Sequence, residues 1–227
     1  MDSKLDDTSK KDPKSLILDE FRSGKRLSRI GISFLKGTIT LSFPGPFPSP
    51  TLQIFYTEKS ENLSEIGLTN NPKSLQRGNF RDLAVDDMIK ILTGPGDYKL
   101  ENLTIAGEID NLFAQKLSEK FENHSKIHVD SVQIYMYGSS ETAPVNNLLN
   151  LFQSIKEIDI KSKDLPDEEF TDKLKGITAL KNVEMVTIHN TRNDHVFWDP
   201  ARLMIPRFTV KLDRISVHNY VRMMKVS

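Results

Sequence analysis

The stretch that decides the fold is LENLTI, residues 100–105, whose apolar side chains follow the spacing apolar-x-x-apolar-x-apolar. Leu100, Leu103 and Ile105 occupy the apolar positions, and the same spacing recurs along the chain. The first residues of five such copies lie 29, 26, 28 and 22 residues apart, which indicates an internal repeat. The later copies are VDSVQI (129–134), IKEIDI (155–160), VEMVTI (183–188) and the looser IPRFTV (205–210). An upstream copy, LSRIGI (27–32), stands apart from this series.

The segments between the copies carry the periodicity of helices. Apolar residues within 109–125 recur at helical spacing, and a second stripe, which ends at Phe152, follows within 143–155. A third helix is expected within 164–177, where acidic residues come first and lysines later, as the helix dipole favours. The segment 191–204 has no helical stripe and is expected to be irregular.

Strand and helix therefore alternate, and each unit can bury its apolar face only against its neighbours. The steps between copies overlap the length of leucine-rich repeats, although the asparagine that usually follows the strand in that class is missing. We therefore expect an α/β fold, a leucine-rich-repeat-like stack of β-α units with a parallel sheet, preceded by a short β-hairpin and a helix. Ser216 is a suitable N-cap for a last helix over 217–226. A more ordinary α/β or α+β domain is the alternative.

The front of the chain divides into a charged segment and the start of the domain. Residues 1–27 are polar and charged and are expected to be partly disordered, with a short helix over 16–24 that Gly24 would end. Residues 28–227 are expected to form a single domain.

Two β-rich runs open this domain, GTITLSF (37–43) and TLQIFYT (51–57), and we expect them to form a hairpin. The alternating prolines of 44–50 block regular pairing between the runs, and a proline-rich docking ligand is the alternative reading of that stretch. A helix is expected to follow within 79–93 and to end at the Gly-Pro-Gly of 94–96. These glycines follow a helix, whereas those of a phosphate loop follow a strand, so phosphate binding is not expected.

Composition narrows the possible functions. Lys plus Arg and Asp plus Glu each number 31, so the formal net charge is zero, and nucleic acid is not an expected partner. The chain has no cysteine, which excludes disulfides and thiolate chemistry and fits an intracellular location, cytoplasmic or nuclear. No apolar run is long enough to span a bilayer, so we expect no membrane association.

The histidines give no metal-binding pattern. His124 and His128 are four residues apart, but a predicted helix end lies between them, so they do not share the face that a metal pair needs. His189 lies just before the irregular segment and His195 lies within it, and both are expected to be exposed loop residues. We therefore expect no metal site and no cofactor.

The carboxylates give no catalytic pattern either. Asp86–Asp87 and Glu168–Glu169 are adjacent in sequence, so each pair diverges on a helix and is expected to be solvated. The lone Trp198 is expected to anchor a small apolar cluster, and no Gly-x-Ser-x-Gly motif occurs. We therefore expect no catalytic residues and a protein that is not an enzyme.

A set of segments, taken in order, resembles a known family. They are TLQIFYT (51–57), NFRDLAVDDMIKIL (79–92), KLENLTI (99–105), HVDSVQIYMY (128–137), LFQSIKEIDI (151–160) and IPRFTVKLDRISVHNYVRMMKVS (205–227). Together they are similar to the FTH domain, the F-box-associated module of the expanded nematode F-box families. The resemblance runs from the start of the domain to the end of the chain.

This resemblance implies a role in recognition. In F-box proteins the F-box docks onto an adaptor of a cullin ubiquitin ligase, and the FTH domain is the part that captures a target protein. An F-box is a helical module with a leucine-proline opening, and residues 1–27 are too short and too charged to supply one. The ligase adaptor is therefore an expected partner only if an F-box is present elsewhere in the gene product.

The predicted sheet offers a surface for such a partner. In a stack of β-α units the strands line one face, and the residues between the core positions project from it. These residues are the candidate partner-binding site, although they would also suit a merely solvated face. They are Asn102, Thr104, Ser131, Gln133, Glu157, Asp159, Met185, Thr187, Arg207 and Thr209.

The sequence therefore predicts a non-catalytic protein-recognition module that resembles the substrate-binding domain of an F-box protein and acts on an unknown target protein. Two alternatives stay open. One is an independent binding scaffold or decoy with no link to a ligase. The other is an enzyme whose site has no recognisable motif.

Overall fold

A computed structural model describes residues 29–43, 51–69, 73–93, 99–124, 127–137, 140–162, 167–190 and 207–212. Several predicted features lie outside these residues. They are the charged segment 1–27 with its helix over 16–24, the proline run 44–50, the Gly-Pro-Gly of 94–96, the irregular segment 191–204 with His195 and Trp198, and the last helix over 217–226.

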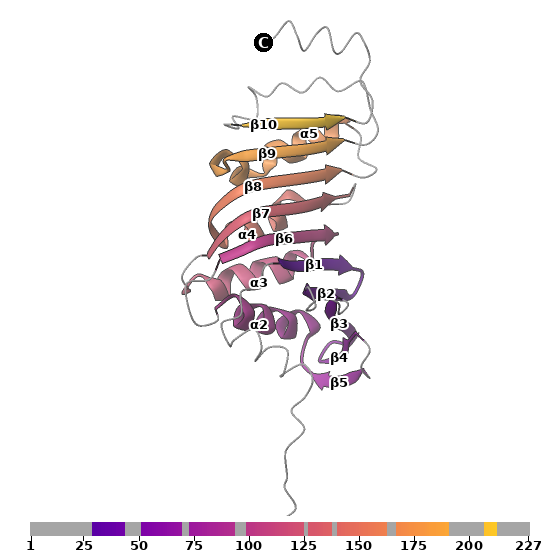
Figure 1. The fold of residues 1–227 in the computed structure, drawn as a ribbon. Helices are drawn as coiled ribbons and strands as arrows, with labels where there is room; N and C mark the ends of the chain where they lie inside the picture. The colour runs from indigo at the N-terminus through magenta and orange to yellow at the C-terminus, as the bar shows by residue number, and fades with distance from the viewer. Residues whose placement is uncertain are drawn as a thin grey trace, which may run out of the picture.

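The described strands form one ten-stranded sheet in the order β10-β9-β8-β7-β6-β1-β2-β3-β4-β5, as Figure 1 shows. One half is parallel and consists of β1 (Arg29–Leu35), β6 (Lys99–Gly107), β7 (Ile127–Met136), β8 (Phe152–Ser162), β9 (Met185–Asn190) and β10 (Phe208–Leu212). From β1 the sheet continues as an antiparallel meander. Its strands are β2 (Thr38–Phe43), β3 (Leu52–Ser60), β4 (Leu63–Leu68) and β5 (Ser74–Arg77).

The register of the parallel half follows the sequence copies. Leu103, the second apolar residue of the opening stretch, lies opposite Val132 of the next copy. The same positions continue across the sheet through Ile158, Val186 and Phe208. The upstream copy, expected to stand apart, is β1, where Ile30 lies opposite Leu103. From β1 to β9 the buried apolar set is therefore continuous across strands that are far apart in the sequence.

Helices cover one face of this sheet (Figure 1). They are α2 (Phe80–Leu92), α3 (Asn111–Phe121), α4 (Thr142–Leu149), α5 (Asp167–Gly176) and the short 3-10 helix η1 (Thr178–Asn182). Two of the helix starts have side-chain caps. The Asn79 side chain accepts a hydrogen bond from the backbone N–H of Arg81 at the start of α2. The Asp110 carboxylate accepts one from the backbone N–H of Phe113 at the start of α3.

Strands β1, β6, β7, β8 and β9 bury alternate side chains against these helices. Leu103 and Ile105 are almost fully buried. Asn102, which precedes them, and Thr104, which lies between them, are partly exposed. The architecture is therefore mixed α/β with a large mixed sheet, packed on one side by helices.

One predicted boundary needs correction, and the sheet contains strands that were not predicted. The second helical stripe does not reach Phe152, because α4 ends at Leu149 and Phe152 begins β8, where it is buried. The predicted hairpin is present as β2 and β3, but it belongs to a longer meander. Strand β5 has no apolar face, since its residues are all exposed, so its sequence carries no signal of a strand.

The acidic pair on α2 was expected to be solvated, and this is wrong for one of its members. Asp87 is 1% exposed and accepts a hydrogen bond of 2.6 Å from the Tyr56 hydroxyl on β3. Lys90, one turn later on α2, lies 3.1 Å from the same carboxylate. Burial of Tyr56, followed by the nearby Asp87 charge, raises the pKa of its hydroxyl well above the usual value. Asp86 is half-exposed, as expected.

Candidate functional site

The predicted binding residues lie on the face of the sheet opposite the helices, here called the open face. They form two cross-strand rows, because parallel neighbours in register lie side by side. The first row is Asn102, Ser131, Glu157 and Met185, and the second is Thr104, Gln133, Asp159, Thr187 and Thr209. Arg207 is exposed just before β10, where its carbonyl accepts the N–H of Val186 at 3.0 Å. The structure therefore brings the predicted residues together on one surface.

The prediction missed a third row on the same face. It starts at Ser33 of β1 and runs through Ala106, Tyr135, Lys161 and His189. These residues come directly after the last apolar position of each copy, so extending the alternation by one residue would have found them.

Side chains of this third row make two contacts on the open face. The Lys161 ammonium lies 5.1 Å from the centre of the Tyr135 ring and 3.3 Å from its hydroxyl oxygen. The His189 Nε2 atom lies 2.9 Å from Asp159 Oδ1, although neither atom makes a well-aligned hydrogen bond with another described group. His189 is therefore a strand residue about one quarter exposed, which corrects the expectation of an exposed loop histidine.

The second row would continue from Thr104 of β6 onto Gly31 of β1, and a hollow lies at this position. Gly31 lies between Ser42 of β2 and Thr104 of β6, and it has no side chain to fill the space above the backbone. The cavity, here called the Gly31 hollow, has a volume of about 390 Å³. Its described lining is Arg29, Ile30, Gly31, Ser42, Phe43, Thr51, Asn102, Thr104 and Gln133. Three of the predicted residues, Asn102, Thr104 and Gln133, therefore line one cavity.

The lining of the Gly31 hollow is polar and carries one positive charge. Arg29 is the one ionisable residue in the described lining, and it is exposed at the start of β1. Thr104 donates a hydrogen bond to the side-chain oxygen of Asn102 at 3.3 Å, and this contact does not use the Asn102 amide N–H groups. Among the described residues, neither Arg29 nor Gln133 has a side-chain hydrogen-bond or ion-pair partner. The hollow thus holds more donors than the described residues use.

Arg29 and Gly31 were not among the predicted residues, although the sequence contained the signal. The copy LSRIGI places Arg29 and Gly31 at the positions that Asn102 and Thr104 hold in the opening stretch. Because LSRIGI lies outside the regular series of copies, the repeat alone does not predict that its outward residues belong to the site.

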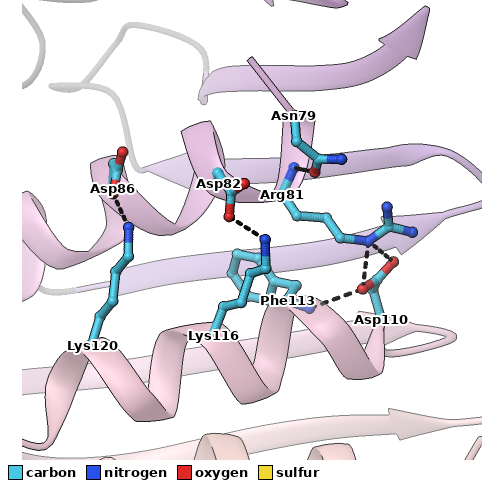
Figure 2. Close-up of polar contacts among 8 residues, drawn as sticks. All are labelled: Asn79, Arg81, Asp82, Asp86, Asp110, Phe113, Lys116 and Lys120. Carbon is cyan, nitrogen blue, oxygen red and sulfur yellow. Dashed lines mark hydrogen bonds and ion pairs between the residues drawn. The ribbon is translucent and has the colours of Figure 1, made fainter. Parts of the chain in front are cut away.

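On the other side of the sheet, α2 and α3 are joined by three ion pairs, which Figure 2 shows. Arg81 Nε lies 2.9 and 2.8 Å from the two carboxylate oxygens of Asp110. Further along the helices, aspartates of α2 meet lysines of α3. These pairs are Asp82 with Lys116 and Asp86 with Lys120. Since α2 packs on β2 and β3 and α3 is the first helix after β6, the pairs join helices that belong to the two halves of the sheet.

A second and larger hollow, of about 550 Å³, lies at the carboxyl end of β1. The starts of α2 and α3 line it, together with the β1–β2 turn and Ser140–Glu141. Arg81 and Asp110 in its lining are paired with each other, and Lys36, Glu108 and Glu141 also line it.

No metal centre is found in the described part of the chain, where no three His, Asp or Glu side chains converge on one point. His124 is exposed beyond the end of α3, while His128 lies in β7 with its Nδ1 atom 2.6 Å from the Ser154 hydroxyl. Within the same residues, no helix has the length and apolar character needed to cross a membrane.

Comparison with protein-family models, with curated proteins and with solved structures found no match to this chain.

Proposed function

We propose that the chain is a non-catalytic protein-recognition module that binds a partner protein through the open face, with the Gly31 hollow at the centre of the contact. The observation that carries this proposal is the polar hollow itself, on a face that none of the described helices covers. Rows of amide, hydroxyl and charged groups around a cavity suit a protein surface, where hydrogen bonds fix the register and a pocket anchors one side chain.

The proposal extends to the architecture of the parallel half. We propose that β6, β7 and β8, with the helices that follow them, stack as leucine-rich-repeat-like units. The support is the register, which places equivalent residues of successive copies opposite each other. Repeat stacks commonly bind partners over several units at once, which fits a site built from residues of many strands.

A role as the substrate-binding half of an F-box protein is proposed on the resemblance to the FTH domain. An independent scaffold or decoy would use the same face without a ligase. Co-purification of the full-length protein from cells separates the two, because recovery of the cullin adaptor supports the first and its absence supports the second.

Site-specific photo-cross-linking tests the binding face. A photoreactive amino acid is placed at Gln133 on the open face or, as a control, at Glu119, which is exposed on α3. We expect discrete cross-linked partner proteins from position 133 that are lost when Gly31→Val fills the hollow. Cross-links of the same proteins from position 119, or from position 133 regardless of Gly31→Val, would contradict the proposal.

A further inference from the structure

The first row of the open face extends onto β1, and it carries a positive charge at Arg29 and a negative charge at Glu157. Arg29 of β1 lies opposite Asn102 of β6, and the row continues through Ser131 to Glu157 of β8. Glu157 is partly buried and, like Arg29, has no ion-pair partner among the described residues. The two charges are therefore separated by neutral polar groups and are free to meet charges from outside.

The spacing of this row matches an extended peptide. Neighbouring strands lie about 4.8 Å apart, so three strand spacings place the backbones at Arg29 and Glu157 about 14 Å apart. An extended chain rises about 3.3 Å per residue, so roughly four residues cover this distance. Because side chains of an extended chain alternate with a period of two, residues four apart point to the same side.

We propose that the open face binds an extended segment of the partner protein that lies across β1, β6, β7 and β8 and carries an acidic and a basic side chain four residues apart. The acidic side chain enters the Gly31 hollow and pairs with Arg29. The basic side chain meets Glu157. This inference rests on the proposed function and names the chemistry of its partner.

Charge complementarity assigns the acidic side chain to the hollow. Arg29 is the one charge in the described lining, and a guanidinium binds a carboxylate through two parallel hydrogen bonds. The amides of Asn102 and Gln133 supply further donors beside it. Within a hollow that is partly shielded from water, such a pair is stronger than on a flat surface.

The surroundings of Glu157 assign the basic side chain to the other end. Asp159 is the next outward residue on the same strand, and it adds a second carboxylate. The contact between Asp159 and His189 offsets the charge of the carboxylate only when the imidazole is protonated. The Lys161 ammonium lies over the Tyr135 ring. The β8 end of the row therefore favours a cation.

Selection of peptides from a random display library tests this assignment. The library of 12-residue peptides is selected separately on the full wild-type chain, on the Arg29→Glu/Glu157→Lys double variant, and on Glu119→Lys as a control that changes charge on the helix side. We expect wild type and Glu119→Lys to enrich peptides with Asp or Glu four residues from Lys or Arg. We expect representative peptides to lose at least about tenfold in affinity for the double variant, since both charges then meet like charges.

The outcomes separate this inference from the proposed function. Peptides whose binding is abolished by Gly31→Val or by Thr104→Phe, but which show no paired charges, overturn the inference and leave recognition by the open face standing. Enriched peptides that bind both hollow-filling variants as well as wild type overturn the proposed function too. Peptides that bind the double variant and wild type equally well contradict the pairing of Arg29 and Glu157 with the peptide charges.

Discussion

Replacement of Asp110 should destabilise the protein more than replacement of any other acid in the α2–α3 contact. Its carboxylate both caps α3, through the N–H of Phe113 at 2.9 Å, and binds Arg81 Nε with both oxygens. Loss of an N-cap costs about 1 kcal/mol. Loss of a partly exposed ion pair costs up to about 1 kcal/mol. For Asp110→Ala we therefore expect the free energy of unfolding to fall by about 1–2 kcal/mol.

Two matched variants separate the contributions. Asn is as good a cap as Asp, so Asp110→Asn should lose the ion pair alone, about 1 kcal/mol or less. Asp86→Ala removes an ion pair to Lys120 in which both side chains are nearly half-exposed, and it should cost a similar amount or nothing. Urea denaturation followed by circular dichroism gives the three values. The reasoning is refuted if Asp110→Asn or Asp86→Ala destabilises the protein as much as Asp110→Ala.

Three further predictions concern the core. Tyr56→Phe removes the donor to buried Asp87 and should cost about 1–3 kcal/mol in urea denaturation, and a loss below about 0.3 kcal/mol would contradict the buried hydrogen bond. The pKa of Tyr56 is raised in the folded state, so its hydroxyl contributes fully to the stability of the fold below about pH 10. Above that pH the unfolded chain ionises first and the contribution declines. The free energy of unfolding measured from about pH 8 to 11 should therefore fall less steeply in Tyr56→Phe than in wild type. Gly107 has φ +93°, and a Cβ there would lie 2.0 Å from the Phe34 carbonyl oxygen, so Gly107→Ala should cost about 3 kcal/mol or more in thermal melts, whereas unchanged melting would disprove the strain.

The parallel half of the fold could be predicted because its signal is local and repeated. Each copy places apolar residues at fixed spacing, and the outward residues between them follow from strand alternation alone. Strand β5 could not be found in this way, since Leu75 and its neighbours are exposed and pair at the edge of the sheet through the backbone. The end of α4 was misplaced because Phe152 continues a helical stripe in sequence while it is buried as the first residue of β8.

The candidate site was predictable in part for the same reason. Asn102, Thr104 and Gln133 come from copies inside the series, so alternation placed them on the correct face. The hollow itself depends on Gly31, and a cavity is a property of the residues around it in space. Ser42 of β2 reaches it through an antiparallel pairing that no repeat encodes. The buried position of Asp87 likewise depends on Tyr56, which is 31 residues away in the sequence.

The most direct test of the open face as a recognition surface is the affinity of a partner captured at position 133 for three forms of the chain. These are the wild type, Gly31→Val and Gly67→Val. Gly67 is a matched control, because it lies opposite Phe55 in the same sheet and outside the hollow. A Cβ at Gly67 would come 3.4 Å from its nearest neighbour, compared with 3.3 Å at Gly31. We predict that Gly31→Val weakens binding at least about tenfold while Gly67→Val leaves it unchanged. Equal affinity for all three forms, each shown to be folded, would contradict the account.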